Sequence, residues 1–172
     1  MTAEPRLRVG VAELRRRPGN RVHLERDVAV GGLAVTTAAV PDGGVAHLDA
    51  VLESLSDGIT LSGEVSFPWE GPCRRCLEPT GGELSVPVRE VFKDVPEGGD
   101  LLALDGDAVE LGPVVRDAVV LALPLAPLCS EDCPGPDPEH FPVTSADPER
   151  APADPRWAAL AELRFDPEPD DR

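Results

Sequence analysis

The sequence predicts an α+β fold that is mainly β, with an antiparallel sheet or an open barrel-like core, a few short helices and an irregular, Pro-rich C-terminal segment. Residues 28–95 carry most of the β pattern, because apolar and polar side chains alternate there with a period of two. One apolar run that begins at Leu111-Gly112-Pro113 is typical of a helix start. The chain also contains 20 Pro and 16 Gly, which predict long irregular stretches.

The clearest strand follows the turn Ser56-Asp57-Gly58. Its inward side chains are expected to be Ile59, Leu61, Val65, Phe67 and Trp69. The turn makes Leu48–Leu55 its hairpin partner. A helix over the same residues stays open as an alternative, because Leu48, Val51, Leu52 and Leu55 also match helical spacing.

A further strand is expected at Glu83–Val88, with Leu84, Val86 and Val88 inward. Pro87 indicates an edge position or an irregularity in the strand, because proline cannot donate a hydrogen bond to a neighbouring strand. The acidic, Gly-rich stretch Asp94–Asp107 is expected to be an exposed loop.

Three short helices are expected. The first lies in Val9–Gly19, has Val11 and Leu14 at helical spacing, and ends at Pro18-Gly19. The second runs from Pro113 to Pro124. Its buried face is expected to contain Val114, Ala118, Leu121 and Ala122. The third follows Asp154-Pro155, with Trp157, Leu160, Ala161 and Leu163 as its apolar residues. These patterns divide the chain into one domain at 1–133, a flexible Pro-rich segment at 134–153, and a short helix with an acidic tail at 154–172.

The net charge of −16 is unevenly distributed. Residues 1–26 carry +4, and the rest of the chain carries −20. Such an acidic body disfavours nonspecific nucleic-acid binding, which depends on cationic side chains. It suits a basic protein partner, although acidity that only maintains solubility is the simpler explanation.

Neither a membrane span nor a signal peptide is expected, since the longest uncharged stretches are short and contain proline. We therefore expect the chain to be cytoplasmic. In that compartment its four cysteines are thiols or metal ligands rather than disulfides.

The cysteines form two close pairs, Cys73/Cys76 and Cys129/Cys133. Four thiolates on two loops would suit one structural zinc ion, whereas free cysteines without metal remain the alternative. A redox pair is disfavoured, because no βαβ pattern surrounds Cys73. A catalytic zinc is disfavoured too, because four thiolates leave no position for water.

No sequence motif indicates an enzyme or a small-molecule substrate. The three consecutive arginines Arg15, Arg16 and Arg17 are candidate contacts for RNA phosphates. A solvated basic end of a surface helix explains them as well.

Two boxes carry a family resemblance: Cys73-Arg-Arg-Cys-Leu-Glu-Pro79, and Leu121-Ala-Leu-Pro-Leu-Ala-Pro-Leu-Cys-Ser-Glu-Asp-Cys-Pro-Gly135. Together they resemble the YceD family of large ribosomal RNA subunit accumulation proteins. Family members usually continue with a further cysteine pair, but here Gly135 is followed by Pro136-Asp137, so only the four cysteines remain.

The resemblance implies a non-enzymatic ribosome-biogenesis factor that supports accumulation or processing of large-subunit rRNA. Its implied partners are a basic large-subunit ribosomal protein, an rRNA precursor, or both. The alternative function is an acidic, zinc-clipped protein-interaction module without an RNA role.

Overall fold

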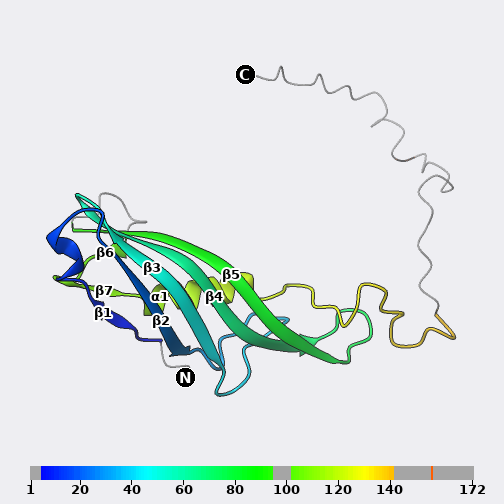
Figure 1. Ribbon diagram of the computed structural model, residues 1–172. Helices are drawn as coiled ribbons and strands as arrows, with labels where there is room; N and C mark the ends of the chain where they lie inside the picture. The colour runs from blue at the N-terminus through cyan, green and yellow to red at the C-terminus, as the bar shows by residue number, and fades with distance from the viewer. Residues whose placement is uncertain (1–4, 95–101, 142–155, 157–172) are drawn as a thin grey trace.

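The computed structural model describes residues 5–94, 102–141 and 156 (Figure 1). Its main body is a five-stranded sheet in the order β2-β3-β4-β5-β6. The elements in chain order are β1 (Arg8–Gly10), the 3-10 helix η1 (Leu14–Arg16), β2 (Arg21–Ala29), β3 (Val45–Ser54), β4 (Gly58–Pro72), β5 (Pro79–Lys93), β6 (Leu102–Ala103), β7 (Ala108–Glu110) and α1 (Gly112–Ala122). All pairs in this sheet are antiparallel except β5–β6, and the sheet stays open between its edges β2 and β6. The expected α+β, mainly β class is confirmed.

The hairpin of β3 and β4 confirms the period-two interpretation. Leu48 lies opposite Val65, and Leu52 lies opposite Leu61. All four side chains are fully buried, as is Phe67, while Trp69 is half-buried. The helical alternative over Leu48–Leu55 is wrong, because the buried positions of β3 alternate strictly from Ala46 to Ser54.

The sheet has one apolar and one polar face. Helix α1 packs on the apolar face against β3, β4 and β5 (Figure 1). Pro113 lies in its first turn, as predicted. The expected buried face is wrong at one position, since Leu121 is 85% exposed. Val115 and Val119 are fully buried and centre the apolar stripe, and Leu121 lies about 200° around the helix from Val119.

The N-terminal helix expected within Val9–Gly19 is reduced to the single 3-10 turn η1. Residues Arg8–Gly10 instead form β1, which pairs with β7. Val11 and Leu14 are buried nonetheless, so their apolar pattern is satisfied by packing rather than by a regular helix. The expected loop at Asp94–Asp107 is also partly wrong, because it contains β6, which pairs in parallel with the end of β5.

Strand β5 has an open side. It pairs with β6 only at Phe92 and Lys93, so within the described chain no strand covers the outer side of its first thirteen residues. This agrees with the edge position expected for Pro87.

After α1 the described chain continues to residue 141 without regular structure. The expected C-terminal helix after Asp154-Pro155 lies outside the described residues, as does most of the Pro-rich segment. The division into 1–133, 134–153 and 154–172 stays a prediction. No described helix has the length and hydropathy required to span a membrane.

Candidate metal centre

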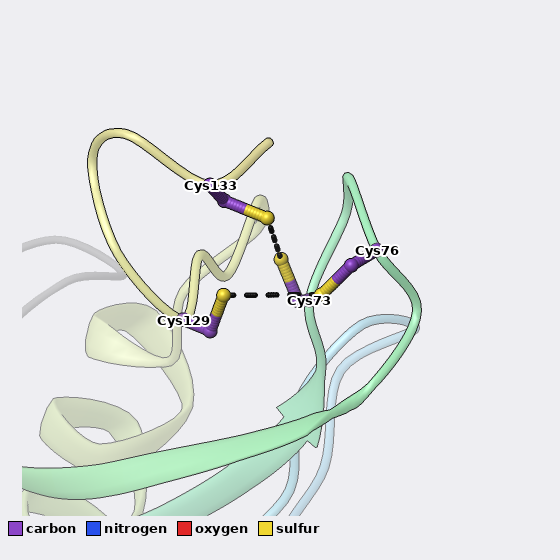
Figure 2. A group of neighbouring side chains, drawn as sticks. All are labelled: Cys73, Cys76, Cys129 and Cys133. Carbon is purple, nitrogen blue, oxygen red and sulfur yellow. Dashed lines mark hydrogen bonds between the residues drawn. The ribbon is translucent and has the colours of Figure 1, made fainter. Parts of the chain in front are cut away.

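The four cysteines lie together at the end of the β4–β5 hairpin where a loop joins the two strands (Figure 2). Cys73 and Cys76 occupy the loop between these strands, and Cys129 and Cys133 come from the chain that follows α1. All four sulfur atoms lie within 4.8 Å of one another. The Sγ atoms of Cys73 and Cys133 are 3.8 Å apart, and so are those of Cys76 and Cys129. These distances are far longer than a disulfide bond, and all four thiols are free.

The first cysteine loop is a tight turn held by backbone hydrogen bonds. Leu77 N donates to Cys73 O at 2.9 Å, and Cys73 N donates to Glu78 O at 2.8 Å. Arg75 N points at the Cys73 sulfur at 3.5 Å. Leu77 adopts φ 65°, a left-handed conformation that is uncommon for a side chain other than glycine. The turn thus directs both sulfurs to the same side of the loop.

Two arginines of this loop join it to the second cysteine loop without any metal. Arg74 uses its backbone, since its N–H donates to Pro127 O at 2.8 Å. Arg75 uses its side chain, because Nη1 donates to Glu131 O at 2.9 Å and to Cys133 O at 3.1 Å. The two loops are therefore positioned by direct contacts as well as by their cysteines.

Three of the four thiols have shifted pKa values. The pKa of Cys73 is lowered to about 6, chiefly by hydrogen bonding from the backbone N–H of Cys76 and then that of Cys129. The pKa of Cys76 is raised to about 12, because burial and the neighbouring thiols outweigh the opposing backbone N–H of Glu78. The pKa of Cys129 is also raised, first by the Cys133 thiol and then by burial. A cation among the sulfurs would favour the thiolate forms of Cys76 and Cys129, whose pKa values are raised in the protein alone.

The arrangement fits a tetrahedral zinc site. With Zn–S bonds of about 2.3 Å, the edges of an S₄ tetrahedron measure about 3.8 Å. Both close sulfur pairs have this separation. Cys73 and Cys133 are buried, while Cys76 is half-buried and Cys129 is exposed, so one side of the cluster is open to solvent for metal entry.

The arginines predicted as phosphate contacts lie elsewhere. Backbone hydrogen bonds join Gly19 and Asn20, which follow η1, to Ser54 at the end of β3. Ser54 lies opposite Ile59 near the start of β4, whereas the cysteines lie beyond the end of β4. A strand of 15 residues separates the two places by on the order of 45 Å. Arg15 is held by Asp94 at 2.6 and 2.7 Å and by Gly106 O at 3.1 Å. Arg16 pairs with Glu13 at 2.6 Å. Arg17 is exposed, with no ion pair to another described residue.

The polar face of the sheet carries a feature that sequence reasoning missed. Glu25, Asp49 and Glu64 lie directly opposite one another on β2, β3 and β4, which makes a row of three carboxylates. His23 reaches Asp49 at 2.5 Å, and its Nε2 atom lies near both Glu25 and Asp49. Only the strand register reveals this row, because the three acids are far apart in the sequence.

Comparison with known proteins gives consistent matches. A family model described as large ribosomal RNA subunit accumulation protein YceD matches residues 61–164. An uncharacterized protein of Mycobacterium tuberculosis strain H37Rv is 32% identical over 165 residues, which cover 90% of this chain and 80% of that protein. The YlbN protein of Bacillus subtilis is 28% identical over 123 residues, which cover 67% of this chain and 69% of YlbN. No solved structure matches. The range matched by the family model contains both cysteine loops and α1, and it continues past residue 141.

Proposed function

Because the chain belongs to the YceD family, whose name denotes accumulation of large-subunit ribosomal RNA, we propose that it is a non-enzymatic factor that supports the accumulation or processing of this RNA in the cytoplasm. The family match is the observation that carries the proposal. The family is named for an accumulation role and not for a reaction. We further propose that the factor acts by binding a basic ribosomal protein of the large subunit.

Zinc has a structural role in this proposal. Cys73, Cys76, Cys129 and Cys133 would supply four thiolates and thereby fill a tetrahedral coordination sphere, which leaves no position for a reacting water. The ion would tie the end of the β4–β5 hairpin to the chain that follows α1. The support for this role is the match between the sulfur separations and a tetrahedron.

The carboxylate row of Glu25, Asp49 and Glu64 supports a basic protein partner. Like charges directly opposite one another in a sheet are destabilising. His23 compensates Asp49, but no described cation pairs with Glu25 or Glu64 within ion-pair distance. Lysine or arginine side chains of a partner would relieve this repulsion and would be attracted by the field of the acidic body.

Direct RNA binding has weaker support. Arg15, the first of the three consecutive arginines, is already bound by Asp94 and a backbone carbonyl. Arg16 also has an acidic neighbour in Glu13. Contact with an rRNA precursor is therefore proposed only through Arg16 and Arg17, as a secondary contact beside the ribosomal protein.

Crosslinking in cells followed by identification of the bound protein and RNA tests the partner. We expect a basic large-subunit ribosomal protein, with yield reduced in the double variant Glu25→Gln/Glu64→Gln. The matched control is Arg16→Gln/Arg17→Gln, which should leave the protein crosslink intact. Crosslinks that depend on the arginines and recover RNA would instead favour direct RNA binding. Crosslinks only to proteins unrelated to the ribosome would overturn the proposal in favour of an interaction module without an RNA role.

A further inference from the structure

A groove of about 530 Å³ lies between α1 and the open side of β5. Its apolar lining includes Val86 and Val88 of β5, Leu102 of β6, and Val114, Ala118, Leu121 and Ala122 of α1. Charged side chains line it as well, with Arg89 and Glu90 from β5 and Asp117 from α1. An apolar floor with charges of both signs is typical of a site for an amphipathic segment.

Nothing in the described chain covers this groove. Leu121 is 85% exposed, although it belongs to the helix that packs on the sheet. Val86 and Ala118 are only half-buried, and both pack against the edge of the core. Leu121 lies in one lining with Val86, Val88 and Ala118 beside the open side of β5, and a contiguous apolar surface of this kind marks an interaction site.

We infer that the groove is the docking site of this chain's own residues 157–165. Their sequence is Trp-Ala-Ala-Leu-Ala-Glu-Leu-Arg-Phe, which places Trp157, Leu160 and Ala161 at helical spacing. The segment is short, so an isolated helix of this length would be marginal in water and needs a surface to pack on. The groove offers such a surface.

The extent of the family match supports this occupant. The matched range ends at residue 164, so it includes Trp157, Leu160 and Leu163. A C-terminal segment that belongs to the family's common region is expected to contribute to its domain rather than to a separate tail. The family match itself says nothing about where the segment lies, and the groove supplies that position.

The length of the intervening chain and the charges of the segment also fit docking of residues 157–165 in the groove. Residues 142–155 lie between the described residues 141 and 156, and a chain of this length reaches about 50 Å when extended, more than the radius of a domain of this size. Arg164 can meet Asp117 or Glu90, and Glu162 can meet Arg89. Because the segment is tethered, its effective concentration at the groove is on the order of millimolar, which favours it over a free partner.

Fluorescence of Trp157 tests the inference on the full chain. The chain has only two tryptophans, so the Trp69→Phe variant leaves Trp157 as the sole emitter. We expect a blue-shifted emission that is protected from acrylamide. Adding Leu121→Glu should shift the emission to that of an indole in water and remove the protection. Leu121 is 85% exposed, so this change leaves the packing of the described core intact.

The matched control is Val45→Glu, which places the same charge at a half-exposed position on β3. It should leave Trp157 protected. Water-like emission in the parent variant, or protection that Leu121→Glu does not change, would overturn the inference. Protection that disappears on dilution would also overturn it, because the segment would then come from a second copy of the chain.

Discussion

The Sγ atoms of Cys73 and Cys133 lie 3.8 Å apart although 60 residues separate them in the sequence. This contact joins the loop at the end of β4 to the chain beyond α1. A long-range connection of this kind orders two irregular loops that have little apolar core of their own. A zinc ion bound by the four cysteines would tie these two loops together.

Zinc content is the first expected outcome. Protein purified without chelator should contain one zinc per chain, and a strong chelator should lower its thermal stability, because structural zinc sites contribute roughly 10–16 kcal/mol of binding free energy to folding. The Cys133→Ser variant should lose the metal, whereas Glu131→Gln should keep it, since only the backbone of Glu131 takes part in the site. Four freely titrating thiols in a stable, metal-free protein would contradict the site.

Substitution of Arg75 should weaken zinc binding, whereas substitution of its neighbour Arg74 should not. Arg75→Ala removes the side chain that donates to the backbone of Glu131 and Cys133. Zinc affinity should fall about 10–100-fold, as is usual for contacts that orient metal ligands. Arg74→Ala keeps the backbone hydrogen bond to Pro127 and should leave the affinity unchanged. Competition with a chromogenic zinc chelator measures both, and equal effects would contradict the positioning role of Arg75.

Neutralising the carboxylate row should stabilise the free protein. Glu64 lies opposite Asp49 on the neighbouring strand, so Glu64→Gln removes a repulsion between like charges. The free energy of unfolding in urea should rise by about 0.2–1 kcal/mol at low salt. Glu83→Gln is the control, because Glu83 lies opposite Pro68. A destabilised Glu64→Gln variant would show that this carboxylate has a favourable contact within the chain.

The pair His47–Asp27 should depend on pH. Hydrogen bonding to Asp27 raises the pKa of His47 above its usual 6.5. Its stabilising effect is therefore complete below about pH 6.5 and is lost as pH rises through the higher pKa of the folded state. Titration by NMR should show this raised value, and Asp27→Asn should lower it. A titration curve of His47 that Asp27→Asn leaves unchanged would contradict the pairing.

Local patterns in the sequence predicted those parts of the fold that depend on residues close together in the chain. Period-two alternation and the turn at Ser56-Asp57-Gly58 were sufficient for the β3–β4 hairpin, because one buried face fixes the register. The face of α1 was wrong at Leu121, since helical spacing alone does not tell which side of an apolar stripe meets the sheet. The small β1–β7 sheet pairs Arg8–Gly10 with Ala108–Glu110. The spacing of neighbouring residues carries no information about such a distant pairing.

The candidate site shows the same division. Cysteine spacing predicted two loops of ligands, and the structure adds that all four sulfurs lie within 4.8 Å of one another. The role of Arg75 was not predictable, because its partners are backbone carbonyls on a distant loop. The row of Glu25, Asp49 and Glu64 was missed for a related reason, since opposite positions on three strands follow only from the register.

The ratio of large- to small-subunit rRNA in cells tests the proposed role in large-subunit rRNA accumulation. It should be measured in cells that lack this protein and in the same cells supplied with it again. The ratio should fall when the protein is absent and recover when it is restored. An unchanged ratio, in cells shown to lack the protein, would contradict a role in large-subunit rRNA accumulation.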